Sequence, residues 1–73
     1  MKKQIELWHD RTSDSDNPRW CVSLCWGDGD EIQCLSVHKQ YSDALKAAVS
    51  EARGWELSLY ERDERGKLNA IDR

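Results

Sequence analysis

The sequence predicts an α+β fold in which one helix packs on one face of an antiparallel sheet of four to five strands, in the order β-β-β-α-β-β. Three observations support this prediction. Several short segments alternate apolar and polar residues, which is the pattern of strands that bury one face. Residues 41–53 instead repeat apolar residues at helical spacing. The chain has 73 residues, of which 38% are hydrophobic and 34% charged, so we expect a single domain over residues 1–73.

The first expected strand is Lys3–His9, in which Ile5 and Leu7 share one face and Trp8 lies on the other. The polar segment at residues 10–18 follows this strand. It contains many turn-forming residues and no apolar anchor, so we expect a mobile loop there.

The next two expected strands, residues 20–26 and 31–38, form a hairpin around Gly27-Asp28-Gly29-Asp30. A two-residue turn needs residues with positive φ, which glycine accepts. It also sorts the apolar residues onto one face better than a three-residue loop does. The resulting register separates aliphatic side chains from thiols and imidazole. One face takes Val22, Leu24, Leu35 and Val37, and the other takes Cys21, Cys25, Cys34 and His38.

The helix expected over residues 41–53 has Ser42 as a suitable N-cap and Gly54 at the position just after its end. A ridge of small residues on its apolar face lets it lie close to a sheet: Ala44, Ala48 and Ala52.

The last part of the chain predicts a second hairpin. Residues 55–62 alternate, with Trp55, Leu57 and Leu59 facing inward and Tyr60 facing outward. Residues 63–66 form a turn, and residues 67–72 form a short final strand.

Three cysteines and a histidine match the ligand types of a Cys₃His zinc site: Cys21, Cys25, Cys34 and His38. The expected register places Cys25 opposite Cys34 and Cys21 opposite His38, with roughly 13 Å between the two pairs. A zinc–sulfur bond is only about 2.3 Å long, so we expect no metal site and no cofactor.

The same residues offer two other reactions, neither of which we favour, although a small enzyme that uses Cys21 and His38 remains a third hypothesis. A disulfide between Cys25 and Cys34 requires an oxidising compartment, and the sequence shows no signal peptide. A nucleophilic pair of Cys21 and His38 would lack an orienting group and an oxyanion site. We therefore expect a cytoplasmic protein with reduced thiols and no catalytic activity. No apolar stretch is long enough to cross a membrane.

A single helix leaves one face of the sheet for contact with a partner. The expected binding surface consists of Trp8, Cys21, Cys25, His38, Tyr60 and Arg62. Aromatic residues are enriched at the centres of protein interfaces, so we expect a module that occludes a larger protein or complex. The net charge of −3 suits a basic partner. A second copy of the chain is an alternative occupant, which would make a homodimer.

Nucleic-acid binding is the alternative function. Exposed aromatic side chains on small sheets stack bases, and Trp8 and Tyr60 are in positions to do so. However, acidic residues lie among nearly all the lysines and arginines, so phosphate binding is less favoured than protein binding.

Several segments together resemble a family of short uncharacterised bacterial and phage proteins. They are Trp20-x-Val22, Tyr41-x-x-Ala44-x-x-x-Ala48-x-x-x-Ala52, Glu56-Leu57 and Gly66-Lys67-Leu68. Some phage anti-CRISPR inhibitors are similar in size and layout. The resemblance implies one helix on an antiparallel sheet and a non-enzymatic inhibitor or accessory role. The acidic segment at residues 10–16 and the cysteines depart from this pattern.

Overall fold

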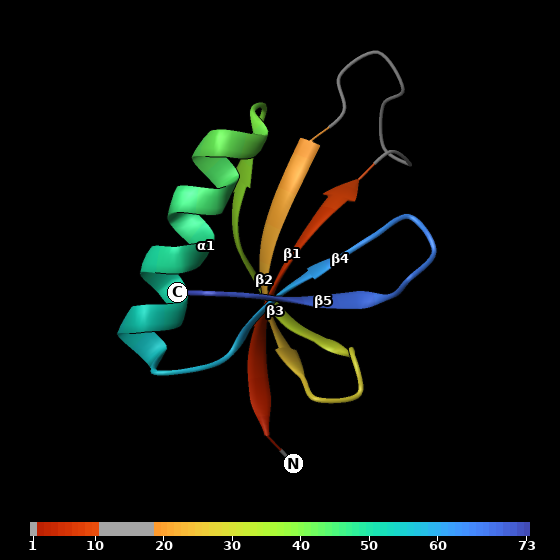
Figure 1. Ribbon diagram of the computed structural model, residues 1–73, viewed down its shortest axis with the longest axis vertical. Coiled ribbons are helices and arrows are strands. Elements are labelled where there is room, and N and C mark those ends of the chain that lie inside the picture. Colours follow the sequence, from red (N-terminus) through yellow and green to blue (C-terminus); the bar gives the residue numbers. More distant parts are fainter. Residues whose placement is uncertain (1, 11–18) are drawn as a thin grey trace.

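The computed structural model describes residues 2–10 and 19–73, which form five strands and one helix in the predicted order (Figure 1). The elements are β1 (Lys3–Asp10), β2 (Arg19–Trp26), β3 (Glu31–His38), α1 (Tyr41–Trp55), β4 (Leu59–Arg62) and β5 (Leu68–Ile71). The α+β class is therefore confirmed. Asp10 belongs to β1, and the rest of the expected mobile loop at 10–18 lies outside the described residues.

The sheet has the order β3-β2-β1-β4-β5, and it is mixed rather than wholly antiparallel. β4 runs parallel to β1, with Ile5 opposite Leu59, while the other neighbouring strands are antiparallel. The expectation of an antiparallel sheet was wrong on this point. Because α1 carries the chain back across the sheet after β3, β4 starts at the same end as β3 and β1, and it therefore runs in their direction.

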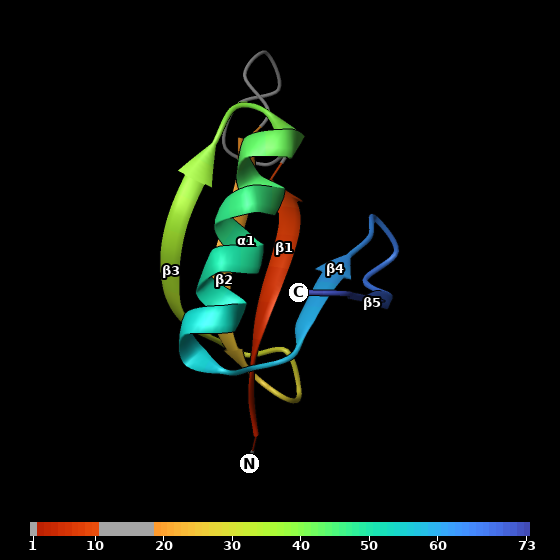
Figure 2. The ribbon, with the colours of Figure 1, turned by 60° about the vertical axis from the view of Figure 1, so that its left-hand side comes forward.

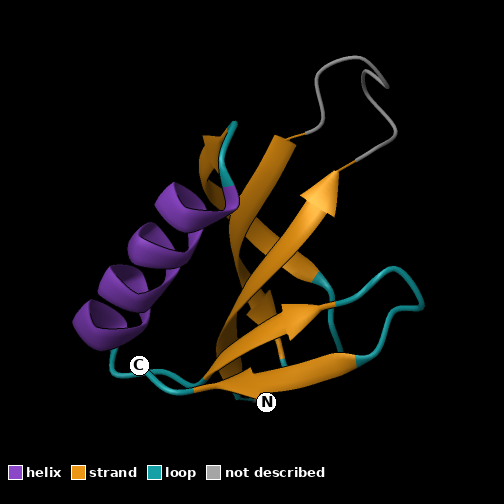
Figure 3. Cartoon of the chain, turned by 45° about the horizontal axis from the view of Figure 1, so that its top comes forward, coloured by secondary structure: helices purple, strands orange, loops and turns teal. Residues whose placement is uncertain are grey.

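α1 packs against one face of the sheet (Figure 3). The apolar side chains between these two layers form the core. Among the described residues, the buried cluster consists of Ile5, Leu7, Val22, Leu24, Ala44, Ala48, Ala52 and Leu59. The three alanines have no exposed surface, which confirms that small residues bring the helix close to the strands.

Both ends of α1 differ from the sequence prediction. Gln40, not Ser42, precedes the first helical residue and serves as N-cap without a side-chain hydrogen bond. At the other end, Glu56 rather than Gly54 adopts the left-handed conformation, with φ 57° and ψ 43°. Glu56 N–H donates to the Arg53 carbonyl at 3.3 Å, and Leu57 N–H donates to the Ala52 carbonyl at 2.9 Å. These two bonds make a Schellman motif that directs Leu57 toward the core.

The longer helix also moves Trp55 out of the expected strand. Trp55 ends α1 with 49% of its surface exposed, and its indole N–H donates to Glu51 at 3.0 Å. The expectation that Trp55 faces inward was therefore wrong, whereas Leu59 is buried as expected.

The turn of the central hairpin has three residues, Gly27-Asp28-Gly29. Trp26 N–H donates to the Asp30 carbonyl, and Gly29 N–H donates to the Trp26 carbonyl, both at 2.9 Å. Gly29 has φ +97°, as a three-residue hairpin loop requires at its last position. The two-residue turn predicted from the sequence is wrong.

Two further register shifts follow along this hairpin, one between Val22 and Ser23 and one between Leu24 and Cys25. Each adds one residue to β3, and an added residue reverses the alternation of faces beyond it. The thiols stay on the face away from α1, as expected, and Leu35 packs against the core. Val37 moves to the thiol face opposite Cys21, and His38 moves to the helix face opposite Trp20. These two placements correct the predicted sorting.

Candidate functional site

The face of the sheet away from α1 is concave and partly filled, rather than open. The strands fan out strongly about the middle of the sheet (Figure 1). This twist brings the β2–β3 turn toward β4, and a Cβ atom on Gly29 would lie 2.5 Å from Arg62 Nη2. The partly open space between them, here called the sheet pocket, has a volume of about 240 Å³. Its lining consists of Glu6, Trp8, Cys25, Gly29, Glu31 and Arg62.

A buried ion pair forms one wall of the sheet pocket. Glu6 is 1% exposed, and its Oε1 accepts from Arg62 Nε at 2.9 Å and from Arg62 Nη2 at 2.8 Å. Glu6 Oε2 accepts from Gln4 Nε2 at 2.8 Å. Arg62 Nη1 donates to the Gly66 carbonyl at 3.3 Å. Both oxygens of the buried carboxylate are therefore hydrogen-bonded, and its charge is compensated.

A hydrogen-bond chain forms the other wall. Trp8 Nε1 donates to Ser23 Oγ at 3.1 Å, and Ser23 Oγ donates to Glu31 Oε1 at 2.7 Å. Ser23 is fully buried, whereas Glu31 is exposed. The chain therefore fixes the Glu31 carboxylate where the pocket meets solvent. Within residues 2–10 and 19–73, every buried side-chain nitrogen or oxygen has a hydrogen-bond partner.

The thiols on this face are protonated at neutral pH. Burial raises the pKa of Cys25 to about 12, with a further contribution from the Glu6 carboxylate that accepts its hydrogen bond. Burial likewise raises the pKa of Cys21 to about 11, and it raises the pKa of Cys34. A neutral thiol is a poor nucleophile and a poor metal ligand, so the arrangement offers no reactive thiolate.

The pair of Cys21 and His38 does not form. Cys21 lies opposite Val37, and His38 Nε2 lies 2.9 Å from Ser36 Oγ. In the part of the chain that the structure describes, no three His, Cys, Asp or Glu side chains come together as a metal site would require.

Alkylation should distinguish the three thiols. We expect iodoacetamide to label Cys34 in the folded protein at mildly alkaline pH, because Cys34 is exposed while Cys21 and Cys25 are buried. All three should be labelled after unfolding in guanidinium chloride.

The raised pKa values also predict that the free energy of unfolding falls as the pH rises above the ordinary thiol value of 9.0, because the unfolded chain then loses protons that the folded chain keeps. Urea titrations at several pH values measure this loss of stability, and mass spectrometry of the labelled peptides measures the alkylation. Rapid labelling of Cys25 in the folded protein would contradict the closed face.

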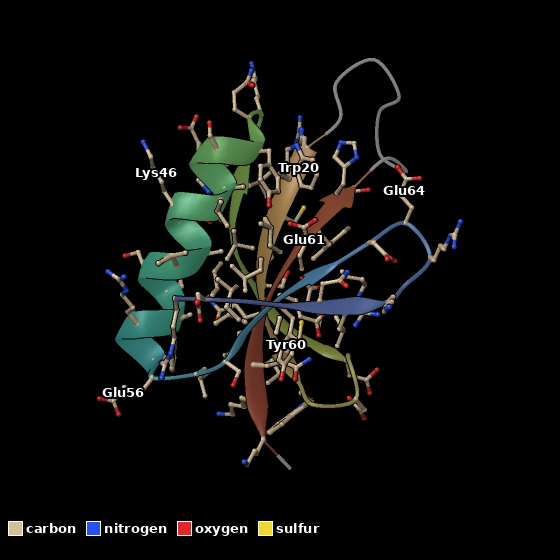
Figure 4. The ribbon with its side chains drawn as sticks, in the orientation of Figure 1. Trp20, Lys46, Glu56, Tyr60, Glu61 and Glu64 are labelled. Carbon is tan, nitrogen blue, oxygen red and sulfur yellow. The ribbon has the colours of Figure 1, made fainter. Side chains whose placement is uncertain are left out.

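The six residues of the predicted binding surface separate into three groups. The pocket lining contains Trp8, Cys25 and Arg62. Tyr60 lies opposite Glu6 on the same face and is half-buried (Figure 4). Cys21 is on this face but is 5% exposed, and His38 lies on the helix face. Neither of these last two residues contributes to the sheet pocket.

Sequence reasoning missed Glu6 and Glu31, which define the chemistry of the pocket. One signal was present: Glu6 lies two residues before Trp8 in an alternating strand, and it therefore shares a face with Trp8. A carboxylate in the middle of a central strand needs a partner, and Arg62 is the partner that β4 supplies.

A second group of interacting side chains, three aromatic rings and one carboxylate, lies on the helix side near the first turn of α1 (Figure 4). His9 stacks on Trp20 with ring centroids 4.4 Å apart, and Trp20 meets Tyr41 edge-on at 4.8 Å. Tyr41 Oη donates to Glu61 Oε1 at 2.5 Å, and this bond raises the pKa of Tyr41 to about 12. The group ties the start of α1 to β2 and β4, and we assign it a structural role.

Comparison of the chain with known protein families, with curated proteins and with solved structures found no match. In the described residues, α1 is too short and too polar to cross a membrane.

Proposed function

We propose that this chain is a non-catalytic protein-binding module whose sheet pocket receives a basic side chain of a larger protein. The observation that carries the proposal is the Glu31 carboxylate, which Ser23 holds at the mouth of a pocket that Trp8 also lines. A fixed carboxylate beside an indole ring is suited to an ammonium or guanidinium group.

The size and charge of the sheet pocket favour this ligand. Pockets for small molecules usually have volumes of about 300–1,000 Å³, and about 240 Å³ is below that range. Because Glu6 is already paired with Arg62, Glu31 is the carboxylate that can take a new partner. Arginine is also one of the residues that contribute most binding energy at protein interfaces.

The acidic character of the chain favours a basic partner surface. Its net charge is −3, which disfavours nucleic acid and attracts proteins that carry basic patches. Basic patches are typical of proteins that bind nucleic acid. A small acidic module bound there would exclude the nucleic acid. This is the form that the inhibitor role implied by the phage-protein resemblance would take.

The test compares Glu31→Lys with Asp72→Lys, which makes the same change of charge at an exposed position outside the pocket. We expect wild type and Asp72→Lys to capture the same protein from native host cells, and Glu31→Lys to bind it at least tenfold more weakly. Cross-linking should place a lysine or arginine of that protein beside Glu31. Circular dichroism confirms that both variants fold.

A direct probe uses a short arginine-rich peptide and NMR. The Trp8 indole N–H resonance should shift on titration with the wild type and not with Glu31→Lys, because this N–H is hydrogen-bonded to the Ser23 hydroxyl that holds Glu31. Equal binding by both variants would overturn the proposal. A salt-sensitive gel shift with RNA or DNA would replace it by the nucleic-acid alternative.

A further inference from the structure

The outer edge of β3 is a second surface with specific chemistry. β3 lies at one end of the sheet order, and among the described strands it pairs only with β2. No described element runs along its outer side (Figure 2). Ile32 and Val37 on this strand are 38% and 46% exposed, and Cys34 is also exposed. An edge strand with free backbone groups and exposed apolar side chains is a template for pairing with another strand.

We propose that β3 pairs antiparallel with β3 of a second copy of this chain. The two-fold axis passes midway between the Cys34 residues of the two copies. The two sheets then form one continuous sheet with both helices on the same side. This contact goes beyond the proposed function, because it uses the free backbone edge of β3. The two surfaces share Glu31, which lines the sheet pocket and starts β3, whereas Val37 does not line the pocket.

The charges at the two ends of β3 favour a second copy as the occupant. Asp30 and Glu31 lie at the start of the strand, and Lys39 directly follows its last residue, His38. Antiparallel self-pairing places the acidic start beside the basic end of the other copy, and the symmetry does this twice. Parallel self-pairing would instead place like charges together. The strand therefore complements its own sequence in the antiparallel direction.

The register follows from the faces of the side chains. Residues that oppose each other across an antiparallel pair lie on the same face of the sheet. Glu31 and Val37 face away from α1, because they oppose Cys25 and Cys21. Gln33 opposes Leu24 on the helix face, where Leu35 also packs.

A two-fold axis at Cys34 brings Glu31 opposite Val37 and Gln33 opposite Leu35, so both pairs match. An axis at Gln33 would place Glu31 opposite Leu35, and these residues lie on different faces of the sheet. An axis at Leu35 would place Gln33 opposite Val37, and these residues also lie on different faces. The register shifts in β3 thus select the register centred on Cys34 from its neighbours.

This register makes a geometric prediction for Cys34. Its Cα atom would lie about 4.5–5.5 Å from the Cα atom of Cys34 in the second copy. Disulfides form at Cα separations of about 4.4–6.8 Å. Diamide should therefore oxidise the two thiols to a disulfide and take up their two electrons and two protons as it becomes the hydrazine. The product is a covalent dimer that is linked through Cys34 alone.

The experiment measures molar mass by sedimentation of the full chain over a wide range of protein concentration. We expect a reversible dimer, a Cys34-linked dimer after oxidation, and no covalent dimer from Cys34→Ser, which still associates. Val37→Glu places like charges opposite Glu31 twice and should raise the dissociation constant about tenfold. Val37→Lys changes the same exposed side chain but opposes Glu31 with a positive charge, so it should retain the dimer.

Two controls separate this contact from general effects of charge. Asn69→Glu adds a negative charge on exposed β5, at the opposite edge of the sheet, and should leave the dimer intact. Adding Glu31→Lys to the Val37→Glu variant should restore association, because the two opposing side chains then carry opposite charges. A wild-type chain that remains monomeric up to its solubility limit would overturn the proposal. A dimer that does not cross-link through Cys34, or equal weakening by Val37→Glu and Val37→Lys, would also overturn it.

Discussion

Replacing Arg62 by methionine is expected to lower the free energy of unfolding by about 3 kcal/mol. The change removes the cation that compensates Glu6, whose side chain is 1% exposed. The neutral donors Gln4 Nε2 and the Cys25 thiol would then be left to hydrogen-bond this carboxylate. A buried charge without its partner is far more costly than an exposed pair is stabilising. For a chain of this length, total stability is only on the order of 4–11 kcal/mol, so the loss is large.

The matched variants are Glu6→Gln and the double change Glu6→Gln with Arg62→Met. Glu6→Gln should cost less than Arg62→Met, because the Arg62 side chain is 32% exposed and can turn toward water. The double variant should be more stable than the sum of the two single losses predicts, because it buries no unpaired charge. Urea titrations give all three values. Additive losses, or a loss below about 1 kcal/mol for Arg62→Met, would show that the ion pair does not support the fold.

The sequence predicted those parts of the fold that depend on local patterns. Alternation in β1 and the alanine ridge of α1 act within one element, so their buried faces could be assigned correctly. The direction of β4 depends instead on which strand it joins. That choice is made by the return of the chain through α1 and by the pairing of Leu59 with Ile5, far apart in sequence.

The candidate site depended on the features that were hardest to predict. The faces of Val37 and His38 follow from the register shifts in β3, and no residue pattern marks where an extra residue enters a strand. Glu6 and Arg62 meet only because β1 and β4 are neighbours. Trp8 was assigned to the correct face from alternation alone, but its partner Ser23 required the register of β1 with β2.

Replacing Gly29 by alanine is expected to destabilise the protein more than the same change at Gly66, and the difference reports on the sheet pocket. Both glycines have positive φ, +97° and +81°, so each alanine meets a backbone cost of about 1–2 kcal/mol. At Gly66 the added Cβ has no neighbour within 4 Å. At Gly29 it would lie 2.5 Å from Arg62 Nη2, which must move and thereby disturb its ion pair with Glu6.

The excess loss at Gly29 should be about 1 kcal/mol or more, because the guanidinium group is displaced from a buried carboxylate. In the Arg62→Met background this excess should disappear, since the side chain that obstructs the Cβ atom is then gone. Urea unfolding of Gly29→Ala and Gly66→Ala in both backgrounds completes the comparison. If the excess persists without Arg62, it arises in the turn itself, and the close approach of the β2–β3 turn to β4 does not hold the pocket closed. If the excess vanishes, the turn, the ion pair and the pocket behave as one unit. A single methyl group in the β2–β3 turn then changes stability through the displacement of a side chain of β4.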